Sequence, residues 1–141
     1  MQYLARQTIG DLDTANYITD YVEHVDKQFE FVISINTAHH FEDILTFWKS
    51  VEKLLFKDSD FFICDLLRPN DKKDIDYIIK SCYPKISNSS LFYKDFFNSL
   101  KAAFSKIEII DFFSDSDYHI NFFEVPQTKL GFWSIQSFAE I

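Results

Sequence analysis

Two adjacent histidines, His39 and His40, are the side chains of this 141-residue chain best suited to proton transfer. A neutral imidazole accepts a proton near neutral pH, so a histidine can act as a general base toward a small nucleophile. Both follow the apolar run Phe29–Ile35 and Asn36, whose amide offers a donor and an acceptor. Because ligands of open α/β sheets bind beyond the carboxyl ends of the strands, we predict that His39 and Asn36 are catalytic and that His40 binds substrate. The alternatives are a turn that begins at Asn36 and packing of the histidines against the next helix.

Polar side chains near a second apolar run form the other part of the candidate site. Asp65 lies at the end of the run DFFICDL, and Arg68 follows three residues later. A guanidinium binds a carboxylate through two parallel hydrogen bonds, so we predict that Asp65 and Arg68 bind substrate. The alternative is an ion pair between these two residues. Asn98 and Ser99, on a predicted helix rich in phenylalanine, either face the same substrate or lie on the solvent side of that helix, and Asn98 is predicted to bind substrate.

Several site types are excluded or disfavoured by what the chain contains. The other histidines, His24 and His119, have no spacing that would join them to a metal site, so no metal is predicted. We interpret Cys64 and Cys82 as small core side chains in a reducing compartment. The chain has only two glycines, whereas loops that wrap a phosphate or nucleoside need several close together. A complete nucleotide-binding loop is therefore excluded.

The composition favours one folded domain over residues 1–141. Hydrophobic residues make up 47% of the chain, including 17 Phe, which excludes a disordered chain. Fourteen basic and 22 acidic residues give a net charge of −8, which argues against binding of nucleic acid. No apolar run approaches the ~20 residues that cross a bilayer, and the first residues do not resemble a signal peptide. We therefore expect a cytoplasmic protein that does not enter a membrane.

The hydrophobic pattern predicts an α/β fold. Apolar residues at helical spacing follow each of two buried-strand runs, and a strand–helix–strand unit with short connections predicts parallel pairing. Phe92, Phe96, Phe97 and Phe104 are interpreted as a core stripe. Two runs around PQTK predict a terminal antiparallel hairpin. The predicted helices cover residues 13–24, 42–56, 71–82, 90–104 and 105–113, and the predicted strands cover residues 29–35, 60–66, 119–125 and 130–136.

Four stretches, taken in order, resemble the C-terminal part of a class I S-adenosylmethionine-dependent methyltransferase. Gly10 and Asp11 resemble the GD that ends the third strand of that superfamily, and FEFVISINTAHHFED resembles its fourth-strand motif. DLLRP resembles the end of the fifth strand, and DFFNSLKAAFSKIE resembles the helix pair before the last hairpin. The resemblance implies a partial Rossmann-like methyltransferase sheet that lacks the first two strands. Its sheet would place the fourth, fifth, seventh and sixth strands of the family side by side, in that order.

The resemblance also implies a function and a cofactor. It implies transfer of a methyl group from S-adenosylmethionine to a small molecule, with Asp11, Ser34 and Ile35 on the cofactor side. The glycine-rich loop of the family is missing, so this chain alone is expected to be inactive or to bind the cofactor weakly. Without its first two strands the sheet has an unpaired apolar edge. The alternatives for this edge are pairing with the N-terminal segment, completion by a second copy in a homodimer or by a complementing chain, or a poorly folded fragment. The alternative function is a non-catalytic interaction module that dimerises or binds a partner through this edge.

Overall fold

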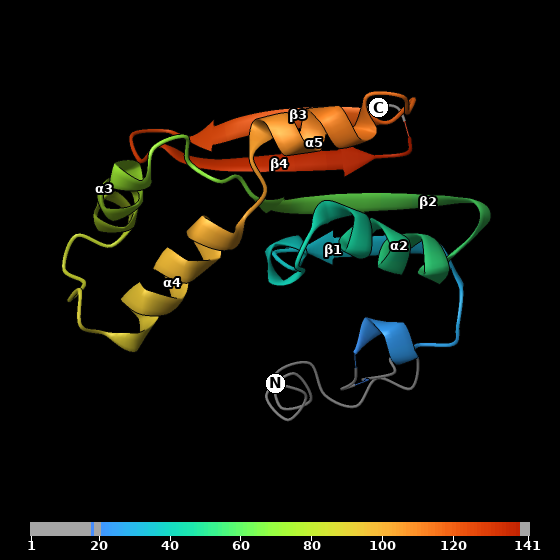
Figure 1. Ribbon diagram of the computed structural model, residues 1–141, viewed down its shortest axis with the longest axis horizontal. Helices are drawn as coiled ribbons and strands as arrows, with labels where there is room; N and C mark the ends of the chain where they lie inside the picture. Colours follow the sequence, from blue (N-terminus) through green and yellow to red (C-terminus); the bar gives the residue numbers. More distant parts are fainter. Residues whose placement is uncertain (1–17, 19–20, 139–141) are drawn as a thin grey trace.

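The described residues centre on a four-stranded sheet whose strands stand in the order β1-β2-β4-β3 (Figure 1). The structure is a computed structural model, and it describes residue 18 and residues 21–138. Residues 13–17, 19 and 20 of the predicted helix 13–24 lie outside this range, and at its described end only Val22–His24 is helical, as a 3-10 turn after the extended Tyr21. In chain order the elements are the 3-10 helix η1 (Val22–His24), β1 (Phe29–Ile35), the 3-10 helix η2 (Ala38–His40), α2 (Ile44–Leu54), β2 (Leu55–Leu66), α3 (Lys72–Cys82), α4 (Leu91–Ala102), α5 (Lys106–Phe113), β3 (His119–Val125) and β4 (Leu130–Gln136).

The first half of the sheet is the predicted strand–helix–strand unit. β1 and β2 pair in parallel, with Val32 opposite Phe61, and α2 forms the crossover between them. The helix begins after Asp43, whose carboxylate accepts a hydrogen bond from the backbone N–H of Thr46 at 2.7 Å. It ends two residues earlier than predicted, because the chain becomes extended at Leu55 and pairs there with β1. The polar KDSD segment, which joins the predicted helix 42–56 to the predicted strand 60–66, falls within β2 as an irregularity: Asp58 has a φ of 65°, and the register with β1 shifts there.

The terminal hairpin has the predicted bounds and completes the sheet. β4 pairs antiparallel with both β2 and β3, so it lies between them. Gln127 and Lys129 adopt positive φ angles of 68° and 57° in the connecting turn. The result is a mixed sheet with a parallel half and an antiparallel half, which confirms the predicted fold class.

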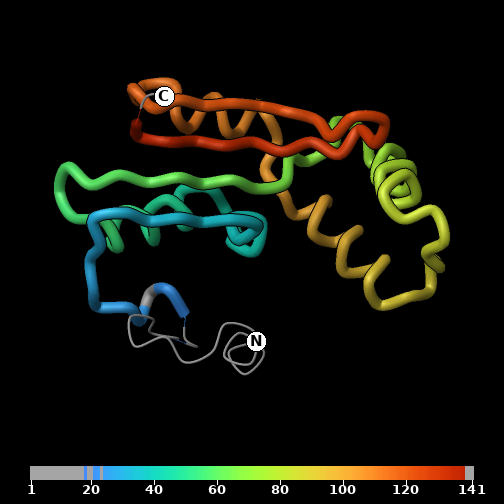
Figure 2. The backbone as a smooth tube through the Cα atoms, turned by 180° about the vertical axis from the view of Figure 1, so that it is seen from behind, coloured from blue at the N-terminus to red at the C-terminus, as the bar shows by residue number. Residues whose placement is uncertain are grey.

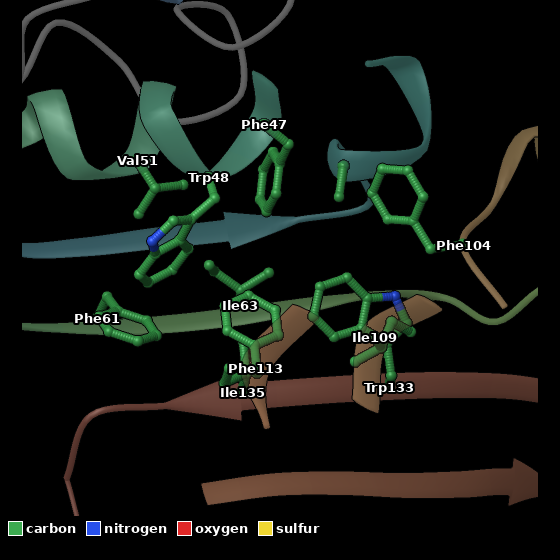
Figure 3. Packing of buried hydrophobic residues seen from close by; sticks show 11 residues of the cluster. Phe47, Trp48, Val51, Phe61, Ile63, Phe104, Ile109, Phe113, Trp133 and Ile135 are labelled. Carbon is green, nitrogen blue, oxygen red and sulfur yellow. The ribbon is translucent and has the colours of Figure 1, made fainter. Parts of the chain in front are cut away.

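Two helices cover the same face of the sheet. Figure 1 shows α2 and α5 in front of the strands, and Figure 2, seen from behind, shows both helices on the far side of the strands. Their buried side chains meet those of β2 and β4 in one hydrophobic core (Figure 3). The large members of this core are Phe47, Trp48 and Val51 of α2, Phe61 and Ile63 of β2, Phe104, Ile109 and Phe113 in and before α5, and Trp133 and Ile135 of β4.

A second hydrophobic cluster lies beyond the carboxyl end of β2, between α3 and α4 (Figure 1). It contains Ile75, Ile78 and Ile79 of α3 together with Leu100 of α4, all of them buried. α4 begins after Ser90, whose side chain accepts from the backbone N–H of Tyr93, as a capping residue should. This packing fixes α4 beside the strand ends that were predicted to carry the site.

Short hydrogen-bonded connections set the ends of α4 and α5. The predicted end of α4 at residue 104 is wrong by two residues, because Phe104 forms a bridge with Leu67 and accepts the backbone N–H of Arg68 at 2.9 Å. The predicted capping box is present: Ser105 accepts from the backbone of Glu108, and the Glu108 carboxylate accepts from the backbone of Ser105.

β1 forms one edge of the sheet within residues 21–138. Its side chains that point away from α2 are apolar and exposed, with Ile33 61% exposed. The others in this row are Phe29, Phe31 and Ile35. Over the part of the chain that the structure describes, there is no helix with the length and apolar character needed to span a membrane.

Candidate active site at the ends of the parallel strands

Parallel pairing brings the carboxyl ends of β1 and β2 to the same edge of the sheet. Asn36, directly after β1, has a φ of 52°, in the left-handed region that asparagine tolerates better than most residues. Its backbone N–H donates to the carbonyl of Cys64 at 2.9 Å, and the chain then turns into η2. Asn36 therefore begins a turn, as one of its two predicted roles required. It also lines a cavity, as its other predicted role, a catalytic one, requires.

A buried histidine–aspartate pair joins the two strand ends. Nδ1 of His39 lies 2.6 Å from Oδ1 of Asp65, and the two residues are 7% and 1% exposed. Because a carboxylate only accepts hydrogen bonds, Nδ1 carries a proton, and in the neutral imidazole Nε2 then keeps its lone pair. His39 is therefore held as the tautomer that can accept a proton at Nε2.

Asp65 is held in place by backbone donors as well. Its Oδ2 accepts from the N–H of Ala38 at 2.5 Å, and its Oδ1 accepts from the N–H of Leu66 at 2.6 Å. With His39, three donors satisfy a carboxylate that is almost completely removed from water, as a buried charge requires. The alternative predicted from the sequence, an ion pair between Asp65 and Arg68, is therefore wrong.

Arg68 lies away from this pair. Its guanidinium binds the carboxylate of Glu108 at 2.5 Å, in a half-exposed ion pair between the β2–α3 connection and α5. Burial raises the pKa of Glu108, but its hydrogen bonds to Ser105 and the charge of Arg68 outweigh this effect and hold the pKa below its ordinary value. Arg68 therefore stabilises the start of α5 and does not face the cavity beside His39.

His40 and the residue after it occupy the outer side of η2. The His40 ring lies 4.2 Å from that of His39, measured between ring centroids, and is exposed. Phe41 packs edge-on against Phe47 of α2 at 5.3 Å. The packing predicted for the start of the helix is thus provided by Phe41, while His40 remains accessible beside His39.

A cavity of about 440 Å³ opens beside His39, between the strand ends and α4. Its size falls within the range of ligand sites in proteins, roughly 300–1,000 Å³. Its polar side chains come from Asn36, His39, Asp95 and Ser99, and its apolar side chains come from Leu66, Tyr83, Phe92, Phe96, Leu130 and Phe132.

One stripe of α4 forms a wall of this cavity. Phe92, Asp95, Phe96 and Ser99 follow the spacing i, i+3, i+4, i+7, which places them on one helix face. The interpretation of Phe92 as a core residue is therefore wrong, because Phe92 is half-exposed and lines the cavity. Phe96 lines the cavity and also packs against the hydrophobic cluster of α3 and α4, as a core residue does. Asn98, the predicted substrate-binding residue of this helix, lies exposed on another face, and its neighbour Ser99 takes the position in the wall.

The cavity residues with polar atoms that the sequence prediction missed are Tyr83 and Asp95; the apolar residues Leu66, Leu130 and Phe132 were also not predicted. The spacing of Asp95 between Phe92 and Phe96 was the available signal, because it marks a polar residue within an apolar stripe. Tyr83, just after α3, had no such signal. Its ring contacts those of Phe92 and Phe96, with centroids 4.9 Å and 6.2 Å away.

The two cysteines are free thiols and are only partly buried. Burial raises the pKa of the Cys64 thiol, and the charge of Asp65 raises it further. These surroundings therefore disfavour the thiolate of Cys64, which is the nucleophilic form of a cysteine.

The residues predicted to lie on the cofactor side are only partly within the described range. Asp11 lies outside it. Ser34 and Ile35 line a groove of about 360 Å³ that runs between the outer edge of β1 and α2. The groove is mainly apolar, and its polar side chains are hydroxyls only: Ser34, Thr37 and Ser50. Since no carboxylate lines it, the described residues do not fit the ribose hydroxyls of S-adenosylmethionine by themselves.

Two solved structures are similar to this chain over most of its length. One is the plantazolicin methyltransferase BpumL, solved with a triazolic desmethylPZN analog and SAH. Its sequence is 13% identical to this chain, and the two structures superpose with a TM-score of 0.58. The match covers 89% of this chain and 60% of BpumL. DhpI, solved as a complex with SAM and HEP, is 12% identical with a TM-score of 0.51, over 94% of this chain and 62% of DhpI. This chain thus spans less than two thirds of the length of either protein. No protein-family model matches the sequence, and no curated protein matches it.

The strand order and these similarities define the fold class. The observed order β1-β2-β4-β3 corresponds to the fourth, fifth, seventh and sixth strands expected from the resemblance. The described chain has a class I methyltransferase-like fold, in the form of a partial Rossmann-like domain.

Proposed function

We propose that this chain takes part in the transfer of a methyl group from S-adenosylmethionine to a small molecule and that it supplies the acceptor side of the site. The observation that carries this proposal is the buried pair of His39 and Asp65, which opens onto a ligand-sized cavity at the strand ends of a methyltransferase-like fold. Methyl transfer requires the protein chiefly to align donor and acceptor and to exclude water. A base is the further requirement when the acceptor atom still carries a proton.

His39 is assigned the role of that base. Nε2 of His39 takes the proton from an O–H or N–H group of the acceptor, and Asp65 stabilises the imidazolium that results. Asn36, at the same wall, donates or accepts a hydrogen bond to orient the acceptor. His40, exposed beside His39, is proposed to contact bound substrate and to connect the site with solvent.

The donor side depends on residues beyond the described groove. Ser34 and Ile35 are proposed to contact the cofactor, and Asp11 remains the candidate for its adenine amino group. Because the groove offers only hydroxyls, we expect weak binding of the cofactor by this chain alone. A complementing chain, or a second copy of this one, is then needed for a tight site.

Two measurements on the full chain test this proposal. Calorimetric titration with S-adenosylhomocysteine should show weak, saturable binding, whereas a sub-micromolar Kd would contradict the expected weakness of the donor side. Transfer of a labelled methyl group from S-adenosylmethionine to a panel of alcohols and amines should fall about 100-fold or more in His39→Gln, the usual loss of a general base. Transfer that is unchanged in this variant removes His39 from the mechanism. The absence of both binding and transfer at millimolar cofactor rejects the proposed function for this chain.

A second candidate function rests on the edge of the sheet. β1 exposes a row of apolar side chains on one face, and an exposed apolar edge strand is a site for pairing with another chain. On this interpretation the chain is a non-catalytic interaction module. Light scattering after size exclusion should then show association that rises with concentration and is lost in Ile33→Lys. A monomer at high concentration contradicts this candidate.

A further inference from the structure

We propose that the cavity beside His39 selects acceptors that join an apolar ring to a cationic group, and that Asp95 binds the cation. This inference rests on the proposed function, because it names the class of acceptor for that site. It concerns recognition only, so it can be tested by binding without any cofactor.

The charges around the cavity favour a cation. Asp95 is exposed to the cavity, and within residues 21–138 its carboxylate has no hydrogen bond or ion pair. The carboxylate of Asp65 is already saturated by three donors and stays behind His39. Among the described residues, no lysine or arginine lines the cavity to neutralise Asp95. The net charge of −8 adds to the attraction of a cation to this chain.

The aromatic side chains of the cavity favour the same kind of ligand. Tyr83, Phe92 and Phe96 form a continuous cluster, and the centroids of the two phenylalanine rings lie 6.0 Å apart. Tyr83 and Phe92 are about half-exposed, so their rings are free to contact a ligand. An aromatic face attracts a cation within ~6 Å, and an aromatic ring also packs well against an apolar ring.

The positions of these groups along α4 set the orientation of the ligand in the cavity. Asp95 lies between Phe92 and Phe96 on the cavity stripe, so a cation held by its carboxylate also lies near aromatic rings. Leu66, Leu130 and Phe132 supply an apolar surface for the ring of the ligand. A cavity of about 440 Å³ accommodates a single-ring amine with space for further groups.

Three ligands of nearly equal size test this proposal on the full chain. They are 2-phenylethylamine, which is cationic at neutral pH, 2-phenylethanol, which is neutral, and 3-phenylpropionate, which is anionic. Binding is measured by ligand-observed NMR titration at low salt. We expect the amine to bind about five-fold more tightly than the alcohol, from one partly exposed charge pair and one cation–π contact, and the acid to bind most weakly.

Variants then assign the selectivity to a residue. Asp95→Asn should abolish the five-fold preference for the amine while leaving the affinity for the alcohol unchanged. Asp111→Asn is the matched control, because it removes an exposed aspartate from α5 that does not line the cavity. It should keep the full preference.

Each outcome decides the inference. Equal affinity for the amine and the alcohol, preference for the acid, or no binding of any of the three overturns the proposed cation selectivity. A preference that survives in Asp95→Asn overturns the role of Asp95. These failures leave methyl transfer itself open, because they concern the identity of the acceptor, whereas the loss of transfer in His39→Gln concerns the reaction.

Discussion

The carboxylate of Asp65 is the most constrained polar group of the site, and its replacement by an amide tests the proposed arrangement directly. In Asp65→Asn one carboxylate oxygen becomes an NH2 group of nearly the same shape. Both oxygens accept a backbone N–H, Oδ2 from Ala38 and Oδ1 from Leu66. Whichever way the amide is turned, its NH2 group opposes one of these N–H donors. A change of tautomer at His39 can rescue only the bond to the histidine.

The expected loss of stability follows from this conflict. One buried backbone N–H loses its acceptor, which costs about 1–3 kcal/mol, and the remaining bonds to the side chain lose their charge assistance, about 1 kcal/mol in total. We therefore expect the free energy of unfolding to fall by about 3 kcal/mol. For a chain of this size that corresponds to a decrease in Tm of about 10 °C. Asp65→Ala should lose more, since it leaves all three donors without an acceptor.

Urea unfolding followed by tryptophan fluorescence measures the change, with the exposed Asp111→Asn as a control that should shift by no more than about 0.5 kcal/mol. A second measurement needs no variant: the 15N chemical shifts of the His39 ring in the wild-type protein should show the proton on Nδ1. An unchanged unfolding midpoint in Asp65→Asn would refute the hydrogen-bond argument. A proton on Nε2 in the wild type would refute the assignment of His39 as a base.

Two further predictions concern the core and the ion pair outside the site. Trp133 is completely buried, and its indole N–H has no hydrogen-bond partner among the described residues. Trp133→Phe removes this unsatisfied donor, so the free energy of unfolding should fall by only about 1 kcal/mol. Trp133→Ala should lower it by about 3–5 kcal/mol in the same urea experiment, because it leaves a cavity. Equal losses in the two variants would contradict an unpaired indole N–H. Glu108 has a lowered pKa in the folded protein, so the stability it contributes is complete above its ordinary value of 4.5 and is lost as the pH falls through the lower folded value. Wild type should therefore lose more stability than Glu108→Gln on acidification below pH 4.5. Parallel pH profiles of the two proteins would contradict the lowered pKa of Glu108, which its hydrogen bonds to Ser105 and the charge of Arg68 produce.

The strand pattern predicted most of the architecture because it depends on local residues and on simple pairing rules. β1, β3 and β4 have the predicted bounds, and a short crossover helix leaves parallel pairing of β1 and β2 as the expected arrangement. The early start of β2 was missed for a tertiary reason. Its polar KDSD segment resembles a turn, and it does interrupt the pairing: Asp58 has a positive φ of 65°, and the register with β1 shifts between the pairs Phe29–Leu55 and Phe31–Asp60. Because Leu55 pairs with Phe29, β2 nevertheless begins before this irregularity.

The same distinction explains which site residues were found. Asn36, His39 and Asp65 follow or end strands, and parallel strand ends must meet at one edge of the sheet. The proposed partner of Asp65 was wrong because nearness in sequence does not fix direction. Asp65 points inward to backbone donors and His39, while Arg68, past the end of β2, reaches outward to α5.

The face that α4 presents to the cavity depends on packing that its own sequence leaves undecided. Its aromatic residues occupy more than one side of the helix: Tyr93 and Phe97 pack against the hydrophobic cluster of α3 and α4, and Phe92 lines the cavity. Phe96 lies between these two sides and contacts both the cluster and the cavity. Helical spacing alone does not show which of these two faces is buried in the core. The choice is made by Leu100, fully buried against α3, and by the bridge between Phe104 and Leu67, which together fix the rotation of the helix. Once that rotation is set, Asp95 and Ser99 must face the cavity, because they lie three and seven residues after Phe92 on the same stripe.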